Sequence, residues 1–306
     1  MSGSSALPFT GERFTPECVR EIWYEHWHRY AFASGIANGK RVLDAACGEG
    51  YGSALLSRVA ADVVGVDIDA NTVAHARANY AGVPRLRFEQ CDAAALGYAP
   101  ASFDLVVSFE TLEHLKAQEE LVRGFSRVLA ADGTLVISSP DKRTYSDATG
   151  FRNEFHVREL YREELLALLL PHFRQVRLYH QKLLFQSAIW TEDAAADRGE
   201  AWTVTGGEGG LVRSFDYEPI YYVAVCSNDA LPEGLPKMSL FGDRQESVYA
   251  HYNHEIRKNM AAGARIAELE ADLDRLRGEL KAGREELPIS TAHRLFPWLK
   301  RNRSMK

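Results

Sequence analysis

Glycine and aspartate residues recur in the first third of the chain at spacings that suit the binding of a nucleoside. The turn DAACGEGYG contains Gly48 and Gly50, which let backbone N–H groups approach a ligand closely. Asp67 lies 19 residues after Gly48, at the end of an apolar run, where a carboxylate can accept both hydroxyls of a ribose. Asp92 ends the next such run and can accept the exocyclic amine of adenine.

Asp44 restricts the ligand further, because it precedes the first glycine of the turn by four positions. A carboxylate at this place would repel a pyrophosphate, but it suits a cationic ligand or one that carries an amino acid. A glycine-rich turn by itself is also found in dinucleotide-binding folds. The ordered set of Asp44, Asp67 and Asp92 is therefore more informative than the glycines.

A second group of chemically capable side chains follows the next apolar run. Glu110, Glu113 and His114 are spaced i, i+3 and i+4, so all three project from one face if a helix begins there. Two carboxylates and an imidazole on one face form a plausible divalent-ion site. A fourth ligand is expected from a later segment that concentrates such groups, namely Asn153, Glu154, His156 and Glu159.

The elements that must position these residues are alternating strands and helices. From Lys40 onward the apolar runs RVLDAA, ADVVGVDID, RLRFEQCD, SFDLVVSFE and DGTLVISSP alternate with helical segments. This alternation predicts βαβ units and a parallel sheet with helices on both faces. Two later runs, FRQVRLYHQKLLFQ and PIYYVAVCS, are expected to close the edge of the sheet. Ligands of such folds bind at the carboxyl ends of the strands, where the acidic residues stand.

The motifs VLDAACGEGYGS, GVDID, CDA and FDLVVSFETLEHL, taken together, resemble successive motifs of the class I S-adenosylmethionine-dependent methyltransferases. The resemblance covers about residues 40–140 and implies a Rossmann-like sheet, with S-adenosylmethionine as the cofactor. It implies that Asp44 and the glycine turn hold the methionine part, with Ile68 against the adenine. The residues that it assigns to the cofactor are Asp44, Ala46, Gly48, Gly50, Asp67, Ile68, Asp92, Ala93 and Phe109.

The E-x-x-E-H pattern with a later histidine resembles the metal-binding motif of the small-RNA terminal 2′-O-methyltransferases. That resemblance implies a Mg²⁺ ion held by Glu110, Glu113, His114 and His156. Many class I methyltransferases carry a Glu-His pair at this position without a metal. In that alternative, His114 or His156 is the general base that deprotonates a hydroxyl acceptor, because an alcohol is a poor nucleophile at its ordinary pKa.

The flanks of the core resemble a bacterial methyltransferase group associated with surface-polysaccharide glycosyltransferases. The motifs that carry this resemblance are GERFTPE, WYEHWHRYAFA, NEFHVREL and VRLYHQ. They imply O-methylation of a sugar hydroxyl on a surface glycan of the O-antigen or capsule type, or on a sugar-nucleotide or lipid-linked precursor. The expected acceptor contacts are Trp23, His26, Arg29, Tyr30 and Asn153, although the aromatic residues among them also suit docking of the N-terminal helix on the sheet.

Two other functions are compatible with the same residues. One is a small-molecule methyltransferase that acts on a natural product or a quinone-like acceptor. The other is an assembly module that terminates or sets the length of a glycan chain. The small-molecule enzyme and the glycan enzyme would differ in the acceptor pocket. The assembly module would differ from both in the role of its C-terminal segment.

The composition indicates which class of partner and which cellular compartment to expect for the protein. The chain has 306 residues, and its net charge of −6 with a pI near 6.0 argues against a dedicated nucleic-acid binder. Four cysteines without a C-x-x-C motif suggest a reducing compartment. No signal peptide and no apolar run long enough to span a bilayer is found in the printed sequence, so a cytoplasmic location is expected.

The last portion of the chain has a different character. Apolar residues at heptad spacing predict either a coiled coil of about three heptads or a surface helix docked on its own domain: Ile266, Leu269, Leu273, Leu276, Leu280 and Leu287. A coiled coil would pair with a second copy or with a glycosyltransferase. Residues 281–306 carry seven basic and two acidic residues with interleaved aromatics, which suits the inner face of a membrane.

These patterns together predict five parts of the chain. They are an N-terminal helical cap (1–39), a methyltransferase domain (40–228, with an insertion at about 191–217), a linker (229–243), a helix or coiled coil (244–287) and a basic amphipathic tail (288–306).

Overall fold

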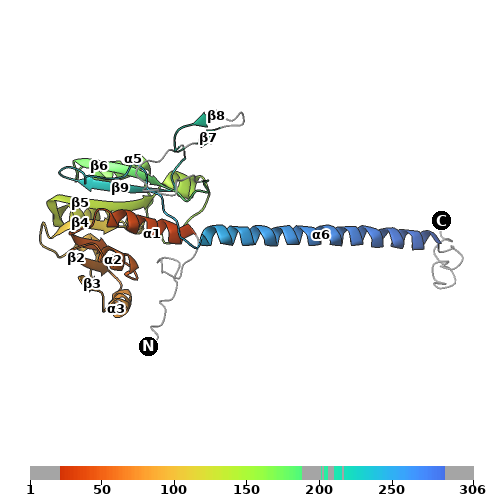
Figure 1. Ribbon diagram of the computed structural model, residues 1–306, viewed down its shortest axis with the longest axis horizontal. Helices are drawn as coiled ribbons and strands as arrows, with labels where there is room; N and C mark the ends of the chain where they lie inside the picture. The colour runs from red at the N-terminus through yellow and green to blue at the C-terminus, as the bar shows by residue number, and fades with distance from the viewer. Residues whose placement is uncertain (1–20, 188–200, 202, 206–209, 216, 287–306) are drawn as a thin grey trace, which may run out of the picture. The chain divides into compact units, whose positions relative to one another are not determined.

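The computed structural model describes residues 21–187, 201, 203–205, 210–215 and 217–286 (Figure 1). The predicted basic tail, residues 288–306, therefore lies outside the described residues, as do Leu287 and parts of the predicted cap and insertion. The chain divides into two compact units, residues 1–242 and 243–306.

Seven strands form the central sheet of the first unit, in the order β3-β2-β1-β4-β5-β9-β6 (Figure 1). Their bounds are β1 Arg41–Ala45, β2 Asp62–Asp67, β3 Leu86–Gln90, β4 Phe103–Ser108, β5 Leu129–Pro140, β6 Gln175–Gln181 and β9 Tyr221–Ser227. Strands β1 to β5 pair in parallel, whereas β9 is antiparallel to both β5 and β6. The predicted Rossmann-like α/β sheet is thereby confirmed.

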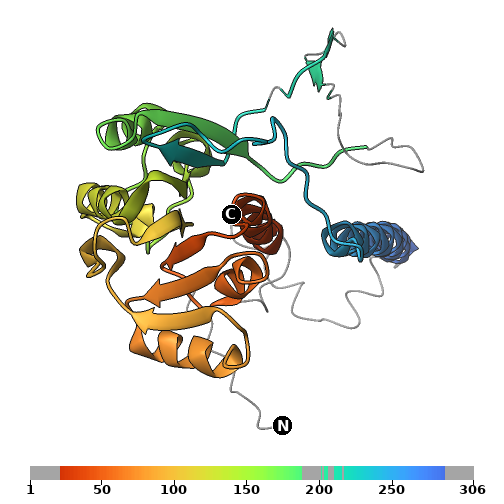
Figure 2. The same ribbon diagram turned by 60° about the vertical axis from the view of Figure 1, so that its left-hand side comes forward.

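Helices cover both faces of this sheet (Figure 2). One face carries α4 (Gln118–Val128) and α5 (Arg162–Leu169), and the other carries α1 (Glu21–Ser34), α2 (Tyr51–Leu56) and α3 (Ala70–Asn79). Short helical turns lie at η1 (Ala93–Ala95), η2 (Leu112–His114) and η3 (Arg143–Asp147). A small hairpin, β7 (Thr203–Thr205) with β8 (Gly210–Val212), lies within the predicted insertion.

Alternating strand residues build the two apolar layers of the core. One layer packs α4 and α5 against Leu43, Val64, Val106 and Leu135. The other packs α1 and α2 against Val42, Val63, Leu105 and Val136. All eight strand residues are fully buried, and their alternation follows from the period of two of a β-strand. This packing fixes the carboxyl ends of β1, β2 and β4 along one edge of the sheet.

The expectation that one helix face presents Glu110, Glu113 and His114 is wrong. Only a short turn forms, over Leu112–His114, and α4 does not begin until Gln118. Glu110 has φ 50°, in the left-handed region that a helix does not use. Its backbone N–H donates to Ser138 Oγ at 3.0 Å, which holds this conformation.

The second unit contains one long helix, α6 (Ser247–Glu286), of 40 residues. Within the described part of the chain, no helix has both the length and the apolar character needed to cross a bilayer.

Candidate functional site

The glycine turn after β1 wraps around the carboxylate of Asp67. The backbone N–H of Gly48 donates to Asp67 Oδ2 at 3.1 Å, and that of Asp69 donates to Oδ1 at 3.0 Å. Gly48 and Gly50 have φ of 55° and 95°, which glycine adopts without a steric penalty. A Cβ atom at Gly50 would lie 2.7 Å from the Phe88 ring, so the turn also needs a glycine there for space.

Asp44 lies beneath this turn and is fully buried. Ser53 Oγ donates to its carboxylate at 2.6 Å, and Tyr30 Oη donates at 3.1 Å. Burial raises the pKa of Asp44 to about 7, even though both hydrogen bonds favour the charged form. A cationic group placed near Asp44 would favour its ionised form, as predicted for the amino-acid part of the cofactor.

A cavity of about 350 Å³ opens at this edge of the sheet. Its walls include most of the residues that the sequence assigns to the cofactor, namely Ala46, Gly48, Asp67, Ile68, Asp92, Ala93 and Phe109. Asp44 and Gly50 are not in its wall but support it from below. The side chain of Ile68 is 65% exposed and so presents an apolar surface on which a flat ring can stack.

The same cavity extends to a cluster of Glu113, His114 and His156. One ligand atom from each of these residues lies within 4.8 Å of the others. Glu113 is 1% exposed, and neither of its carboxylate oxygens has a hydrogen-bond partner among the described residues. Burial raises the pKa of Glu113 well above its ordinary value, and the charge of Glu110 adds to this effect.

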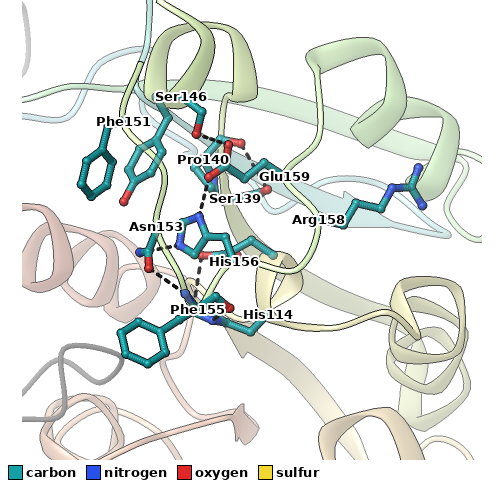
Figure 3. A network of polar contacts seen from close by, with 12 residues as sticks. His114, Ser139, Pro140, Ser146, Phe151, Asn153, Phe155, His156, Arg158 and Glu159 are labelled. Atoms are coloured by element: carbon teal, nitrogen blue, oxygen red, sulfur yellow. Dashed lines mark hydrogen bonds and ion pairs between the residues drawn. The ribbon is translucent and has the colours of Figure 1, made fainter. Parts of the chain in front are cut away.

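His156 is held from both sides of its ring (Figure 3). Its Nδ1 lies 2.6 Å from Glu159 Oε1, and its Nε2 lies 3.0 Å from Asn153 Nδ2. Ser146 Oγ donates to the other oxygen of Glu159, and the Tyr145 ring stacks on the imidazole at 5.3 Å. With its proton on Nδ1, His156 donates a hydrogen bond to Glu159. The lone pair of Nε2 then faces Asn153, so this tautomer can act as a base at Nε2.

His114 lies next to His156, with ring centroids 5.0 Å apart. Its Nδ1 is 3.0 Å from the carbonyl oxygen of Phe155, which requires a proton on that nitrogen (Figure 3). His114 Nε2 lies 3.9 Å from Glu113 Oε1. Both imidazoles thus direct Nδ1 toward an acceptor of the protein.

Glu110 is separated from this cluster by its own partners. Ser138 Oγ donates to Glu110 Oε1 at 2.7 Å, and Arg29 Nη1 lies 3.5 Å from the same oxygen. Of the four predicted metal ligands, the structure therefore gathers Glu113, His114 and His156, while Glu110 pairs with a buried cation.

Arg29, which was expected to contact the acceptor, is buried and is not part of the cavity wall. It is 2% exposed, its Nε donates to Gln181 Oε1 at 2.7 Å, and its guanidinium lies 4.5 Å above the Tyr221 ring. Burial by itself lowers the pKa of Arg29, but the combined effect of neighbouring Glu110, Tyr221, Glu25 and Glu113 outweighs burial and raises it. Neither Nη nitrogen has a hydrogen-bond acceptor among the described residues.

The other predicted acceptor residues divide into two groups. His26, Tyr30 and Asn153 line the cavity, and burial together with the charge of Arg29 keeps the pKa of His26 well below its ordinary value. Trp23 is not in its wall; its ring packs against Trp27 at 5.3 Å and against other aromatic rings. Trp23 thus packs within α1 and against Phe241, outside the cavity.

Sequence reasoning assigned no role to several residues of the cavity wall, among them Tyr145 and Tyr221. Tyr145 follows β5 in an irregular stretch, and Tyr221 begins β9. The tendency of ligands to bind beyond the carboxyl ends of strands was the signal available for Tyr145. No local pattern marked Tyr221.

Part of the chain is similar in sequence to known methyltransferases. Residues 43–137 match the family model described as "Methyltransferase domain". A probable S-adenosylmethionine-dependent methyltransferase of Mycolicibacterium smegmatis is 41% identical over 168 residues, which cover 54% of this chain and 64% of that protein. A ubiquinone biosynthesis O-methyltransferase of Azorhizobium caulinodans is 32% identical over 132 residues, which cover 42% and 52%.

Among solved structures, the YcgJ protein of Bacillus subtilis aligns with a TM-score of 0.48 and 19% identity, covering 67% of this chain and all of that one. The chain spans less than two thirds of the length of the curated relatives described above.

Proposed function

We propose that this chain, whose residues 43–137 match the methyltransferase-domain family, is an S-adenosylmethionine-dependent enzyme that methylates a hydroxyl oxygen of a small-molecule acceptor. The observation that carries the proposal is the single cavity of about 350 Å³ that joins a nucleoside-binding end to a histidine-rich end. Asp67 and Asp92 stand at the first end, and His114 and His156 stand at the second.

The residues of the first end fit the cofactor. Asp67 is positioned by the glycine turn to accept ribose hydroxyls, and Asp44 supplies a buried carboxylate for a cationic amino group. The cofactor supplies an activated methyl group, so the protein must position the acceptor and remove its proton.

His156 is the residue best placed to take that proton. Glu159 holds its Nδ1 at 2.6 Å and stabilises the imidazolium that forms when Nε2 accepts a proton. The side-chain amide of Asn153 contacts His156 Nε2 at the position that an acceptor hydroxyl would take. We therefore assign His156 as the general base and Glu159 as its positioning residue.

The acceptor class is supported by the relatives. The ubiquinone biosynthesis O-methyltransferase is similar to this chain over 132 residues, which favours a small, quinone-like or phenolic acceptor. No relative described here supports the surface-glycan acceptor that the flanking motifs suggested.

A divalent cation at Glu113, His114 and His156 is a second way to activate the hydroxyl. The observation in its favour is Glu113, a buried carboxylate with two oxygens that have no hydrogen-bond partner among the described residues. Mixed imidazole and carboxylate ligands suit a transition-metal ion as well as Mg²⁺. A bound cation would lower the pKa of a coordinated hydroxyl and engage His156 Nε2 as a ligand.

The test is methyl transfer from labelled S-adenosylmethionine to a catechol, a para-hydroxybenzoate and a nucleotide-sugar. We expect a phenolic product, abolished in His156→Ala and retained in the matched control His172→Ala, whose ring pairs with the half-exposed Glu119. Methylation of the nucleotide-sugar alone would overturn the small-molecule assignment.

The same assay separates the two ways of activating the hydroxyl. Full turnover in chelator supports the general base. Loss of turnover in chelator, restored by Mn²⁺ or Mg²⁺, supports the cation and rejects His156 as the base.

A further inference from the structure

The helix α6 presents a continuous apolar seam to solvent. Ile266, Leu269, Leu273, Leu276 and Leu280 alternate at steps of three and four residues, and their side chains are 48–69% exposed. Five large apolar residues on one stripe of a helix are costly to leave in water. Their spacing is that of the a and d positions of a two-stranded coiled coil, with Ile266, Leu273 and Leu280 at a.

The charged residues that flank the apolar seam indicate which partner helix fits it. In this register Arg265 and Asp272 occupy g positions, and Glu270 and Arg277 occupy e positions. A parallel, in-register pair of helices places each g residue beside the e residue five positions later on the other helix. Arg265 then faces Glu270, and Asp272 faces Arg277, so both contacts join opposite charges. The two-fold symmetry of a pair makes each contact occur twice.

The antiparallel arrangement that buries the same seam is disfavoured by charge. When two copies are antiparallel and centred between Leu269 and Leu273, Asp272 lies near Asp272 of the other copy, and Glu270 lies near Glu270. Both contacts bring like charges together, which is destabilising.

Asn259 adds a separate argument for the parallel register. It occupies the a position one heptad before Ile266. A single asparagine at an a position pairs with its counterpart in a parallel dimer and penalises shifted registers. Asn259 therefore fits a pair in which identical residues face one another.

Within a single helix the same charges already have partners. Arg265 Nη1 lies 2.8 Å from Glu268 Oε2, and Asp272 Oδ1 lies 2.8 Å from Arg275 Nη2. These side chains are more than half exposed, so such pairs contribute little to stability and exchange readily for contacts between helices.

From the exposed seam and this charge pattern, we propose that α6 is a dimerisation element that pairs with α6 of a second copy as a parallel, in-register coiled coil. The seam spans about three heptads, from Asn259 to Leu280, which is short for a coiled coil. The dimer is accordingly concentration-dependent, and its stability depends on the charge pairs. This proposal is independent of the methyl-transfer chemistry.

Sedimentation velocity of the full chain over a concentration series tests the pairing. We expect a monomer–dimer equilibrium that Arg265→Glu weakens by about tenfold, because both contacts with Glu270 become repulsive. Glu270→Arg should weaken it similarly. An equimolar mixture of the two variants should restore the dimer, as should the double variant R265E/E270R.

Glu268→Arg is the matched control, since it makes the same charge change as Glu270→Arg at a position that faces away from the seam. It should leave the equilibrium unchanged. A chain that stays monomeric at every concentration, or variants that fail to rescue one another, would overturn the proposal. Association with a different protein in place of self-association would overturn it as well.

Engineered disulfides test the orientation. Ala262→Cys, at a d position, should form a disulfide between copies in a parallel, in-register pair. In the antiparallel pair the two sulfurs would stand about 27 Å apart along the helix axis, from a rise of 1.5 Å per residue. Ala271→Cys, on the outer face, is the control that should not cross-link. Cross-linking equal to that of the unaltered chain would reject the parallel pair.

Discussion

Tyr30 and Asp44 form a buried hydrogen bond, 3.1 Å long, that joins the N-terminal helix α1 to the first strand of the sheet. The phenol ring of Tyr30 also lies over Gly52, where a Cβ atom would come within 2.0 Å of the ring carbon Cζ. The helix, the strand and the cofactor turn are thus fitted to one another through a single tyrosine.

Cofactor affinity should depend on pH through Asp44. Its pKa of about 7 means that the carboxyl gains a proton as the pH falls below neutrality, and the protonated form cannot pair with a cationic amino group. We expect the dissociation constant of S-adenosylmethionine to rise about tenfold per pH unit below the midpoint, since one proton must leave on binding. Calorimetric titration at several pH values measures this slope.

Asp44→Asn and Tyr30→Phe serve as controls for this assignment. The asparagine variant should bind weakly at every pH. Tyr30→Phe removes a hydrogen bond that lowers the pKa of Asp44, so the midpoint should move to higher pH. An unaltered protein whose affinity does not change with pH would contradict the role of Asp44.

Gly52→Ala should destabilise the first unit by about 1–3 kcal/mol, the usual cost of inserting a methyl group into a packed core. The added Cβ would overlap the Tyr30 ring. Urea denaturation checks the change in free energy of unfolding. Gly124→Ala, within α4, meets no atom within 4 Å and should instead stabilise by roughly 0.5–1 kcal/mol through helix propensity. Equal effects of both substitutions would refute the packing argument.

Asp67→Ala should weaken S-adenosylmethionine binding by at least about tenfold, because charge-assisted hydrogen bonds to ribose hydroxyls contribute roughly 1.5–3 kcal/mol. The loss includes any relaxation of the turn, since Gly48 and Asp69 also donate to this carboxylate. Asp67→Asn retains one acceptor oxygen but places an NH2 group against one of these two N–H donors, so it should also disturb the turn. Unchanged affinity in the alanine variant, by calorimetry, would remove Asp67 from the ribose site.

Glu159→Gln should lower turnover by about tenfold or more. The reason is that His156 loses the carboxylate that stabilises its imidazolium. S-adenosylmethionine binding should not change, which separates this effect from damage to the cofactor end. A variant with unchanged turnover would remove Glu159 from this role.

The sheet and the cofactor end were predictable because their signals are local. The strands β1, β2, β4 and β5 contain apolar runs, and Asp44 and Asp67 stand at the ends of β1 and β2. Short-range spacing therefore located both carboxylates at one edge without knowledge of the rest of the fold.

The acceptor end was only partly predictable, because its geometry depends on distant residues. Glu110 leaves the expected helix face since Ser138, 28 residues later, fixes its backbone and its carboxylate. Arg29 was expected to touch the acceptor, but it is buried against Gln181 and Tyr221, which come from two strands late in the chain. Neither contact corresponds to a periodic pattern in the sequence from which it could be predicted.

Adjacent residues of α1 reach opposite ends of the cavity, since Tyr30 bonds to Asp44 below the cofactor turn and Arg29 pairs with Glu110 beside the histidines. The two ends of the cavity therefore share one helix. A substitution that displaces α1 is accordingly expected to change the affinities for donor and acceptor together, rather than one of them alone.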